Sequence, residues 1–458
     1  MPSSDRRPVA VDLFAGAGGL SLGLEQAGFD IAAMSEYDPV HCAVHARNFP
    51  LTSVICADVS KLSADAMYKA AAQGLAAHGH AADWDGRIDL VAGGPPCQGF
   101  SMMGKRLIDD ARNRLVFEFF RLVSQLHPRY FLMENVPGMM SGGHKTQILD
   151  SLISEFAAAG YHVIDPPNIL SAADFGVPQA RRRLFLIGAA DDERLPLYPL
   201  STVTARPRHG THGTPLSPLP DGVPDWGPSV EDAIGDLPDA NSFQALLDGE
   251  DVMMSSEMLA TMDALSSTYA KRMRDPRLDP QDLSYSRRWD PALLTGSGRT
   301  VHTQVSIDRF AATAPGSVEP ISRFYRLTPD GLCNTIRAGT GSEHGAFTSP
   351  RPIHYEYPRV ITVREAARLH SFPDWFRLHR TKWHGFREIG NAVPPLLGQA
   401  VGRSIMTALD AHPIVPTEII DTGDNSLLGL DMDDARLHFG ADRDSIPPAR
   451  RRPSITPH

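Results

Sequence analysis

Cysteine is scarce in this chain, and long apolar runs are missing. The 458 residues include 4 cysteines, Cys42, Cys56, Cys97 and Cys333, and none of them forms a C-x-x-C pair. The sequence therefore indicates neither a zinc cluster nor a disulfide framework, so we expect no metal site and a reducing compartment. No run is apolar enough to span a bilayer, and residues 1–8 lack the apolar core of a secretory signal. We expect a cytoplasmic protein without a membrane partner.

Acidic residues outnumber basic ones, which limits how the chain can meet nucleic acid. There are 54 Asp and Glu against 44 Lys and Arg, a net charge of −10. This balance excludes a protein that coats nucleic acid over its whole surface, but it leaves room for a local basic cleft. Basic residues cluster at 181–183, 271–274 and 287–288, and each cluster could equally be a solvated face.

The first 190 residues alternate apolar strand patterns with helical patterns. Helices are indicated at 20–27 and 39–48, with Gly28 at a C-cap position. The alternation predicts an α/β fold, a doubly wound and mostly parallel sheet with helices on both faces and ligands at the carboxyl ends of its strands. The predicted strands are 9–14, 31–35, 53–56, 88–92, 130–133, 161–164 and 183–187.

The composition changes after residue 190, which predicts a second, smaller domain. Residues 195–357 are rich in Pro, Gly, Ser and Thr and show weak periodicity. Helical patterns return after Thr362, an N-cap with Glu365 three residues later, and at 394–409. We expect a first domain at 1–190, a loop-rich domain at 191–357, a return to the first domain at 358–412 and a largely disordered acidic tail at 413–458. Within that tail, residues 425–439 could hold a short helix.

A glycine-rich segment follows the first predicted strand and opens a helix. It reads Asp12-Leu13-Phe14-Ala15-Gly16-Ala17-Gly18-Gly19. Glycines there let backbone N–H groups approach a ligand at the helix N-terminus. Ser21 takes the last glycine place of the dinucleotide fingerprint, so the segment alone is a weak signal.

Three residues near the ends of later strands support a ligand-binding role for that segment. Glu36 ends the second strand, where an acid commonly binds ribose hydroxyls. Tyr37 could stack on an adenine, and Asp58 could accept from its amino group. Each alone could equally be a capping acid or a packed aromatic. Together they indicate a pocket for an adenosine-containing cofactor.

Cys97 stands on a rigid loop directly after an apolar strand. The loop reads Gly93-Gly94-Pro95-Pro96-Cys97-Gln98-Gly99-Phe100-Ser101. Two prolines fix the backbone before the thiol, and the glycines allow another molecule to come close. The pattern favours a presented thiol, although burial is the commoner fate of a lone cysteine.

Polar residues end two further strands. Glu134 follows the strand 130–133, which puts it on the same sheet edge as Cys97 and pairs an acid with a nucleophile. Gln179-Ala180-Arg181-Arg182-Arg183 precedes the last strand. Because Arg181 and Arg183 alternate with Arg182, we predict that both share one face and reach the same site. The alternative is an exposed basic strand start.

This ordered series resembles the cytosine-C5 DNA methyltransferase family up to about residue 410. It also includes Arg364-Glu365 and Gly390-Asn391-Ala392-Val393, in which Ala392 stands where many members carry serine. The resemblance implies a Rossmann-like S-adenosylmethionine-dependent methyltransferase fold, with residues 191–357 as the target-recognition domain. It implies a bacterial DNA (cytosine-5-)-methyltransferase acting on one short double-stranded sequence. The implied partners are that DNA and a restriction endonuclease of a restriction-modification system, with a monomer as the default.

The resemblance also implies a covalent mechanism on a flipped-out base. Cys97 matches the thiolate that adds to cytosine C6, and Glu134 the acid that protonates or hydrogen-bonds N3. Arg181 matches the residue that holds the base carbonyl and orients that acid, with Gln179 and Arg183 in the same motif. The sulfonium of S-adenosylmethionine then donates its methyl group to C5.

Matching residue by residue gives the other expected contacts. Segment 98–115 resembles a mobile loop that closes over the base. The cofactor-binding residues are Phe14, Gly16, Gly18, Glu36, Tyr37, Asp58, Val59, Pro96, Leu115, Asn391 and Val393. The DNA-binding residues are Ser101, Lys105, Arg106, Arg112 and Arg337.

Three other functions compete with this interpretation. The first is an RNA cytosine methyltransferase of the same fold. The sequence of the Cys97 loop and the large variable domain favour DNA over RNA as the substrate. The second is a non-catalytic DNA-binding relative, which would have no need of Cys97 and Glu134 together. The third is a nicotinamide-dependent oxidoreductase, supported by the glycine segment alone.

Replacing the expected nucleophile tests the assignment directly. Cys97→Ser should abolish methyl transfer, because a hydroxyl is a far weaker nucleophile than a thiolate. Binding of DNA and of the cofactor should stay largely intact, as measured by a gel-shift assay and by calorimetry. Normal turnover by this variant would rule out Cys97 as the nucleophile.

Overall fold

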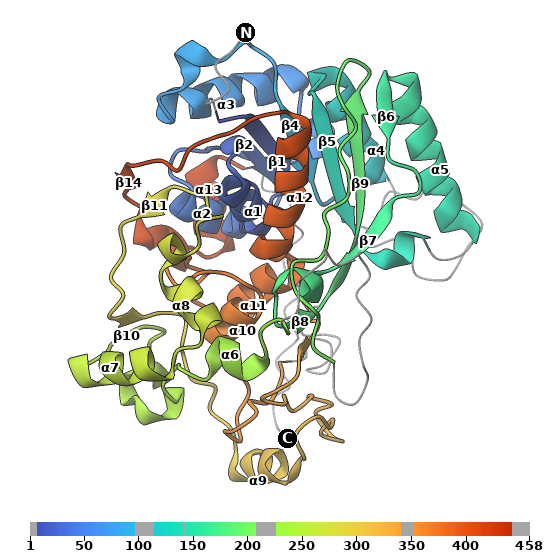
Figure 1. The fold of residues 1–458 in the computed structure, drawn as a ribbon. Helices are drawn as coiled ribbons and strands as arrows, with labels where there is room; N and C mark the ends of the chain where they lie inside the picture. The colour runs from blue at the N-terminus through green and yellow to red at the C-terminus, as the bar shows by residue number, and fades with distance from the viewer. Residues whose placement is uncertain (1–6, 97–113, 141–142, 208–225, 340–350, 442–458) are drawn as a thin grey trace, which may run out of the picture.

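One mixed sheet organises the fold. The computed structural model describes residues 7–96, 114–140, 143–207, 226–339 and 351–441 (Figure 1). The strands of the sheet are β1 (Val9–Leu13), β2 (Asp30–Glu36), β3 (Ser53–Cys56), β4 (Leu90–Gly93), β5 (Tyr130–Asn135), β6 (Tyr161–Val163), β7 (Asn168–Ser171) and β9 (Arg182–Ala190). Their order is β3-β2-β1-β4-β5-β9-β6, and β7 also pairs with β9. Strands β1 to β5 pair in parallel, whereas β9 runs antiparallel to β5, β6 and β7.

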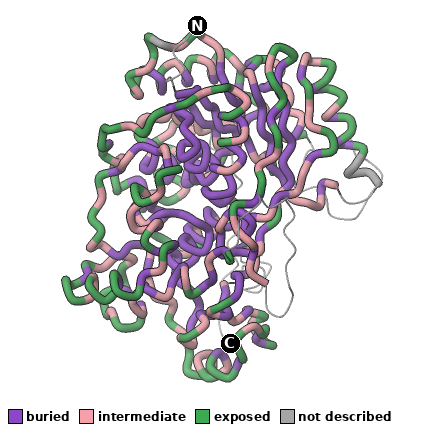
Figure 2. The backbone as a smooth tube through the Cα atoms, viewed as in Figure 1, coloured by how far each residue is buried: buried purple, intermediate pink, exposed green. Residues whose placement is uncertain are grey.

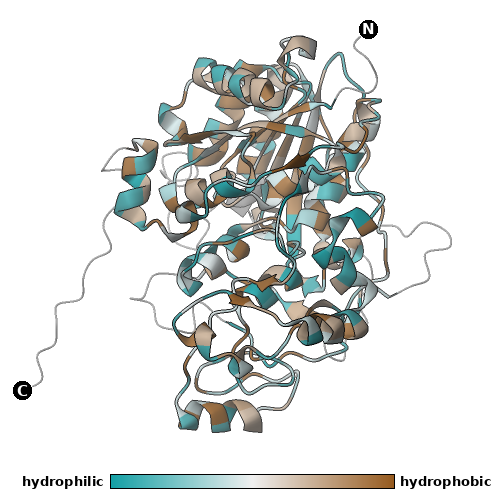
Figure 3. Ribbon diagram, turned by 90° about the vertical axis from the view of Figure 1, so that its left-hand side faces the viewer, coloured by the Kyte–Doolittle hydropathy of each residue, from teal (hydrophilic) through white to brown (hydrophobic). Residues whose placement is uncertain are grey.

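Helices cover both faces of the sheet. Helices α1 (Gly19–Ala27) and α12 (Pro395–Ala408) pack on one face, and α3 (Ala64–Ala77), α4 (Arg114–Leu126) and α5 (Gly143–Ala158) on the other. Along β1, Ala10 joins the first layer while its neighbours Val9 and Val11 join the second. Burial on both faces explains why the strands are almost continuously apolar (Figures 2 and 3). The predicted doubly wound α/β fold is confirmed.

Local sequence signals set several helix ends. Gly28 ends α1 with a φ of 109°, a left-handed conformation that favours glycine. Asp38 caps α2 (Pro39–Asn48) by accepting a hydrogen bond from Val40 N at 3.0 Å. At α10 (Val363–Leu369), Thr362 and Glu365 exchange hydrogen bonds of 3.2 and 2.7 Å. The predicted capping box is therefore confirmed.

Residues 191–357 form short elements joined by long connections. Within the described part, strands of two residues pair as β10-β12, β11-β14 and β13-β8. The elements within 191–357 are α6 (Val230–Ile234), β10 (Val252–Met253), α7 (Ser256–Leu265), α8 (Thr268–Arg274), β11 (Ser286–Arg287), β12 (Leu293–Leu294), α9 (Gln304–Ala312) and β13 (Cys333–Asn334). Outside this stretch lie β8 (Gln179–Ala180), α11 (Lys382–Asn391) and β14 (Ile419–Ile420).

The hydrophobic core runs from the sheet into this loop-rich part. A single cluster joins Leu22 of α1 and Leu397 of α12 to Val230 of α6, Tyr269 of α8 and Ile389 of α11. Figure 2 shows the buried chain continuing between the two parts. The change at residue 191 is thus a change of composition and not an interruption of the packing.

A buried ion-pair network also crosses that junction. Arg368 of α10 is fully buried, and its guanidinium binds Asp236 at 2.7 Å, just after α6, and Asp374 at 2.8 and 2.7 Å. It also donates to the carbonyl of Ala233 at 3.1 Å. These partners offset the cost of burying the charge and keep the pKa of Arg368 raised.

The expectation of a largely disordered tail from residue 413 is wrong for residues 413–441. These residues form β14, a 3-10 helix η10 (Asn425–Gly429) and α13 (Met432–Phe439), so the short helix considered at 425–439 is confirmed. The excess aspartates act as helix caps, since Asp424 accepts from Ser426 N and Asp431 from Asp433 N and Asp434 N. Leu428 and Ala435 are fully buried and anchor the segment.

No helix in the described ranges combines the length and the apolar character needed to span a bilayer.

Removing the buried Arg368 should cost far more than removing an exposed arginine. Arg368→Ala removes the principal ion-pair partner of Asp236 and Asp374 and should lower the free energy of unfolding by about 3–5 kcal/mol. Arg288, whose pair with Asp421 is about 70% exposed, is the matched control, and Arg288→Ala should cost about 0–1 kcal/mol. Urea denaturation measures both. Equal losses would show that the Arg368 network does not hold the junction together.

Candidate active site

The glycine segment follows β1 at the carboxyl edge of the sheet. Phe14, Gly16 and Gly18 all have positive φ, of 58°, 57° and 101°. A side chain added at Gly18 would lie 2.4 Å from the ring of Phe49, so this glycine is needed for packing. At Gly16 an added Cβ would meet nothing within 4 Å. The segment is therefore closely packed at Gly18, whereas Gly16 has free space beside it. Such space lets a ligand come close to the backbone.

Glu36 ties this segment to the end of β2. Its carboxylate accepts from Gly16 N and from Asp38 N, both at 2.9 Å. Each oxygen can still accept a further hydrogen bond. Tyr37 is 38% exposed beside it. Asp58 accepts from Ser60 N at 2.9 Å, so it caps the turn that contains the buried Val59 and keeps acceptor capacity.

The segment 390–393 lies against the glycine segment. A Cβ on Gly19 would stand 2.5 Å from the carbonyl oxygen of Val393, which shows how closely the two chains approach. Val393 is buried, whereas Asn391 is exposed at the end of α11. Pro96 is exposed after β4, and Leu115 is half-buried at the start of α4. Thus the structure brings the glycine segment, Glu36 and Val393 together.

A second group of side chains surrounds the end of β4. Glu134, almost buried, is held by Arg183, whose Nε lies 2.7 Å from Glu134 Oε1. The other oxygen, Oε2, lies 3.0 Å from where a Cβ on Gly94 would be. Asn135 donates to the carbonyl of Pro95 at 3.2 Å and so fixes the turn to β5. Glu134 Oε2 therefore faces the loop that leads to Cys97.

The interpretation of Arg181 as the residue that orients Glu134 is wrong. Arg181 is fully buried, and its guanidinium binds the carbonyls of Ile336 at 3.0 Å, Gly390 at 3.0 Å and Ala392 at 2.7 Å. The predicted alternation holds, because Arg181 and Arg183 are shielded from solvent, at 0% and 14% exposure, whereas Arg182 between them is exposed. Arg183, on β9, makes the contact instead.

Gln179 is likewise buried and joins chain segments. Its amide nitrogen donates to the carbonyl of Leu369 at 3.2 Å and contacts His370 Nδ1 at 2.9 Å. Its oxygen accepts from Ile336 N at 3.1 Å. His370, which sequence reasoning missed, also lies 3.0 Å from the carbonyl oxygen of Ala392, and burial lowers its pKa. Gln179 is thus placed as a positioning residue.

A buried chain of polar groups under the glycine segment was also missed. Ser21 Oγ lies 2.5 Å from Asp12 Oδ2 and 3.0 Å from His45 Nε2. Burial raises the pKa of Asp12 to about 7, against the opposing hydrogen bond from Ser21, and lowers the pKa of His45 to about 3. In the glycine pattern, Ser21 marks only a missing glycine. Its polarity, in an apolar helix, was the available signal.

The expected DNA contacts are only partly described. Arg337 is exposed, and Thr335, two residues earlier in the chain, donates to the carbonyl of Ala180 at 2.6 Å. Cys97, Ser101, Lys105, Arg106 and Arg112 lie outside the described residues.

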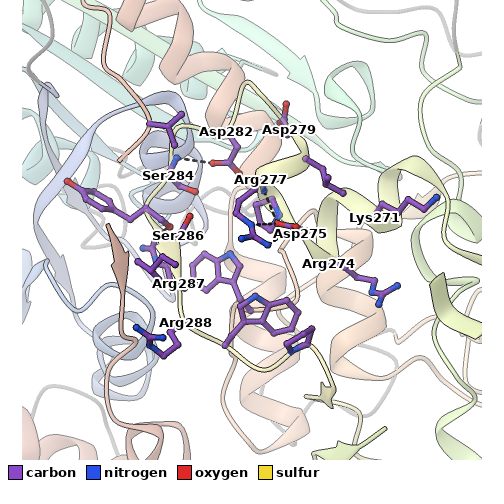
Figure 4. Close-up of a pocket in the computed structure, with 18 of the residues that line it drawn as sticks. Lys271, Arg274, Asp275, Arg277, Asp279, Asp282, Ser284, Ser286, Arg287 and Arg288 are labelled. Carbon is purple, nitrogen blue, oxygen red and sulfur yellow. Dashed lines mark hydrogen bonds and ion pairs between the residues drawn. The ribbon is translucent and has the colours of Figure 1, made fainter. Parts of the chain in front are cut away.

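A cavity of about 550 Å³ lies away from these residues, between 263–291, Trp375 and the tail (Figure 4). Its charged side chains largely pair with one another or with neighbours. Arg277 binds Asp275 at 2.8 Å, and Asp282 accepts from Ser284 N at 2.9 Å. In the described part of the chain, no group of three or more His, Cys, Asp or Glu residues could hold a metal ion.

The sheet order, the glycine segment and the acid after β2 define a Rossmann-like methyltransferase fold. The chain belongs to the C-5 cytosine-specific DNA methylase family, whose profile matches residues 9–407. It is 49% identical to the type II methyltransferase M.XorII of Xanthomonas oryzae pv. oryzae, over 95% of this chain and 93% of that one. It is 32% identical to M.AgeI of Thalassovita gelatinovora, over 87% and 99%. A solved E. coli structure, described as a prophage-encoded DNA modification methyltransferase, matches with a TM-score of 0.64 and 31% identity, over 88% and 99%.

The buried Asp12 should make stability depend on pH. Because its pKa rises from 3.8 to about 7 on folding, the native state holds a proton that the unfolded chain releases. The free energy of unfolding should therefore fall as the pH rises from 3.8 towards 7. Asp12→Asn should reduce this slope in denaturation curves, whereas Asp248→Asn, at an exposed position, should keep it. An unchanged slope for Asp12→Asn would contradict the assigned pKa.

Proposed function

We propose that this protein transfers a methyl group from S-adenosylmethionine to C5 of a flipped-out cytosine within a short double-stranded DNA sequence. The observation that carries this proposal is the arrangement of Glu134, held at Oε1 by Arg183 and facing the Cys97 loop with Oε2. Family membership and the two type II relatives support modification in a restriction-modification system. A paired restriction endonuclease, action as a monomer and a cytoplasmic location are part of the proposal.

The donor set at the carboxyl edge fits S-adenosylmethionine. Glu36 keeps acceptor sites for two ribose hydroxyls, and the open face at Gly16 admits the ligand next to backbone N–H groups. Tyr37, exposed, and Asp58 would hold the adenine. When bound, this cofactor supplies the methyl group on a sulfonium. The roles of Val59, Leu115, Asn391 and Val393 remain part of the same proposal.

The chain's own residues would activate the cytosine. The Cys97 thiolate adds to C6, forming a C–S bond and moving electron density to C5 and N3. Glu134 Oε2 shares a proton with N3, and Arg183 keeps this oxygen aimed by holding Oε1. After C5 gains its methyl group, loss of the C5 proton returns electrons to the ring, and the C–S bond breaks to release Cys97. Since C6 is stacked in a duplex, the base must first leave the helix.

Arg183 and its neighbour Arg182 provide a matched pair for testing this site. Arg183→Ala should lower kcat on the order of 10²–10³-fold, because Glu134 loses the group that orients it. Arg182→Ala should leave kcat within about twofold, since that side chain is exposed and no contact to Glu134 is seen. Methyl transfer to DNA is measured with each purified variant. Equal rates for the two variants would remove Arg183 from the active site.

Bisulfite sequencing of host DNA after expression tests the whole proposal. Wild type should protect cytosines in one short context, and Cys97→Ser should protect none. No protection by soluble, cofactor-binding wild-type protein would refute DNA methylation and direct attention to RNA.

A further inference from the structure

The C-terminal segment 413–441 lies beyond the part of the chain that matches the family profile, residues 9–407. It nevertheless follows a defined path over the described structure. Val415 and Ile419 line the cavity of Figure 4, and β14 pairs in parallel with β11. From there the described chain reaches α2 and forms η10 and α13 (Figure 1).

Backbone contacts fasten this segment to α2. Gly423 N donates to the carbonyl of Arg47 at 2.8 Å, and a Cβ on Gly423 would lie 2.9 Å from the carbonyl oxygen of Ala46. Arg47 Nε also donates to Asn425 Oδ1 at 3.1 Å. Only glycine lets the chain come this close to the end of α2. Helix α2 (Pro39–Asn48) follows Glu36 and Tyr37, and these contacts hold its far, C-terminal end.

The same segment is fastened to the turn before α11. Arg380 N donates to the carbonyl of Leu428 at 2.9 Å, and His379 Nε2 lies 3.0 Å from the carbonyl oxygen of Leu430. Helix α11 leads into residues 391–393, the second cofactor-binding segment. The C-terminal segment thus connects the two supports of the cofactor site.

Leu428 completes the arrangement under the glycine segment. It is fully buried and forms a small hydrophobic cluster with Ala17, 2% exposed, and Val44 of α2. Ala17 lies between Gly16 and Gly18, so Leu428 packs directly beneath the loop that would cradle the cofactor. Burial and the charge of Asp58 raise the pKa of the Tyr37 hydroxyl, and the charges of Arg436 on α13 and of Lys61 oppose this rise. This places α13 close to the residue expected at the adenine.

We propose that the C-terminal segment 413–441 is a part of the cofactor site, with Leu428 as a positioning residue that sets the affinity for S-adenosylmethionine; the proposal rests on the proposed function. Leu428 touches no reacting atom. It holds Ala17 in place and so fixes the backbone N–H groups of the glycine segment, while α13 stands beside Tyr37. Preorganised groups bind more tightly because less order must be imposed on binding.

Calorimetric titration of full-length protein with S-adenosylmethionine tests this. Leu428→Ala should weaken binding about tenfold, equivalent to about 1.4 kcal/mol. Leu437→Ala is the matched control, since Leu437 is 83% exposed and lies in the adjoining α13. It should bind like wild type. At saturating cofactor, Leu428→Ala should keep kcat and the KM for DNA within about twofold of wild type.

Two further variants guard against loss of folding. Leu428→Met conserves volume and should bind like wild type. Asn425→Ala removes only the bond from Arg47 and should weaken cofactor binding in the same direction as Leu428→Ala, by about two- to threefold. Equal affinities for Leu428→Ala, Asn425→Ala and Leu437→Ala would overturn the positioning role, as would a parallel loss of DNA affinity. Failure of wild type to bind S-adenosylmethionine would instead overturn the proposed function, and with it this extension.

Discussion

The burial of Arg181 constrains much of the structure around the active site. A guanidinium without solvent must be hydrogen-bonded, and this one binds the carbonyls of Ile336, Gly390 and Ala392. It thereby fixes the end of the loop-rich region and the segment before Val393 to the start of β9. Gly390 packs so closely on residues 337–338 that a Cβ would lie 2.1 Å from Ala338 N. Arg183, two residues further on, is held in position to meet Glu134.

Much of this fold was predictable from the sequence. Strands β1 to β5 are short, mostly apolar runs, and the capping box at Thr362 and the C-cap at Gly28 are local signals. The edge that gathers the glycine segment, Glu36 and Glu134 follows from parallel strand order alone. The strand β7 went unpredicted, because Asn168–Ser171 is a short, half-buried run whose pairing with β9 depends on tertiary packing.

The misplaced residues share one physical cause. Sequence spacing predicts the side of a strand but not which partners a side chain finds there, so it did not show that Arg181 binds backbone carbonyls while Arg183 meets Glu134. Likewise, aspartates in the tail indicated disorder by composition, although Asp424 and Asp431 cap helices. In both cases a charged residue satisfies backbone groups. That use of charge depends on the folded geometry, which composition does not record.

The continuous core across residue 191 limits which parts of the loop-rich region can be exchanged between relatives. Leu283 N donates to the carbonyl of Gln26, and Arg287 binds Glu25, so part of the loop-rich region is fitted to α1 itself. Exchange of the whole stretch 191–357 between relatives would cut through these contacts and through the Arg181–Ile336 bond. We therefore expect only shorter segments to be exchangeable between relatives. Residues 283–287 and 336 would have to stay with the chain that supplies α1 and Arg181.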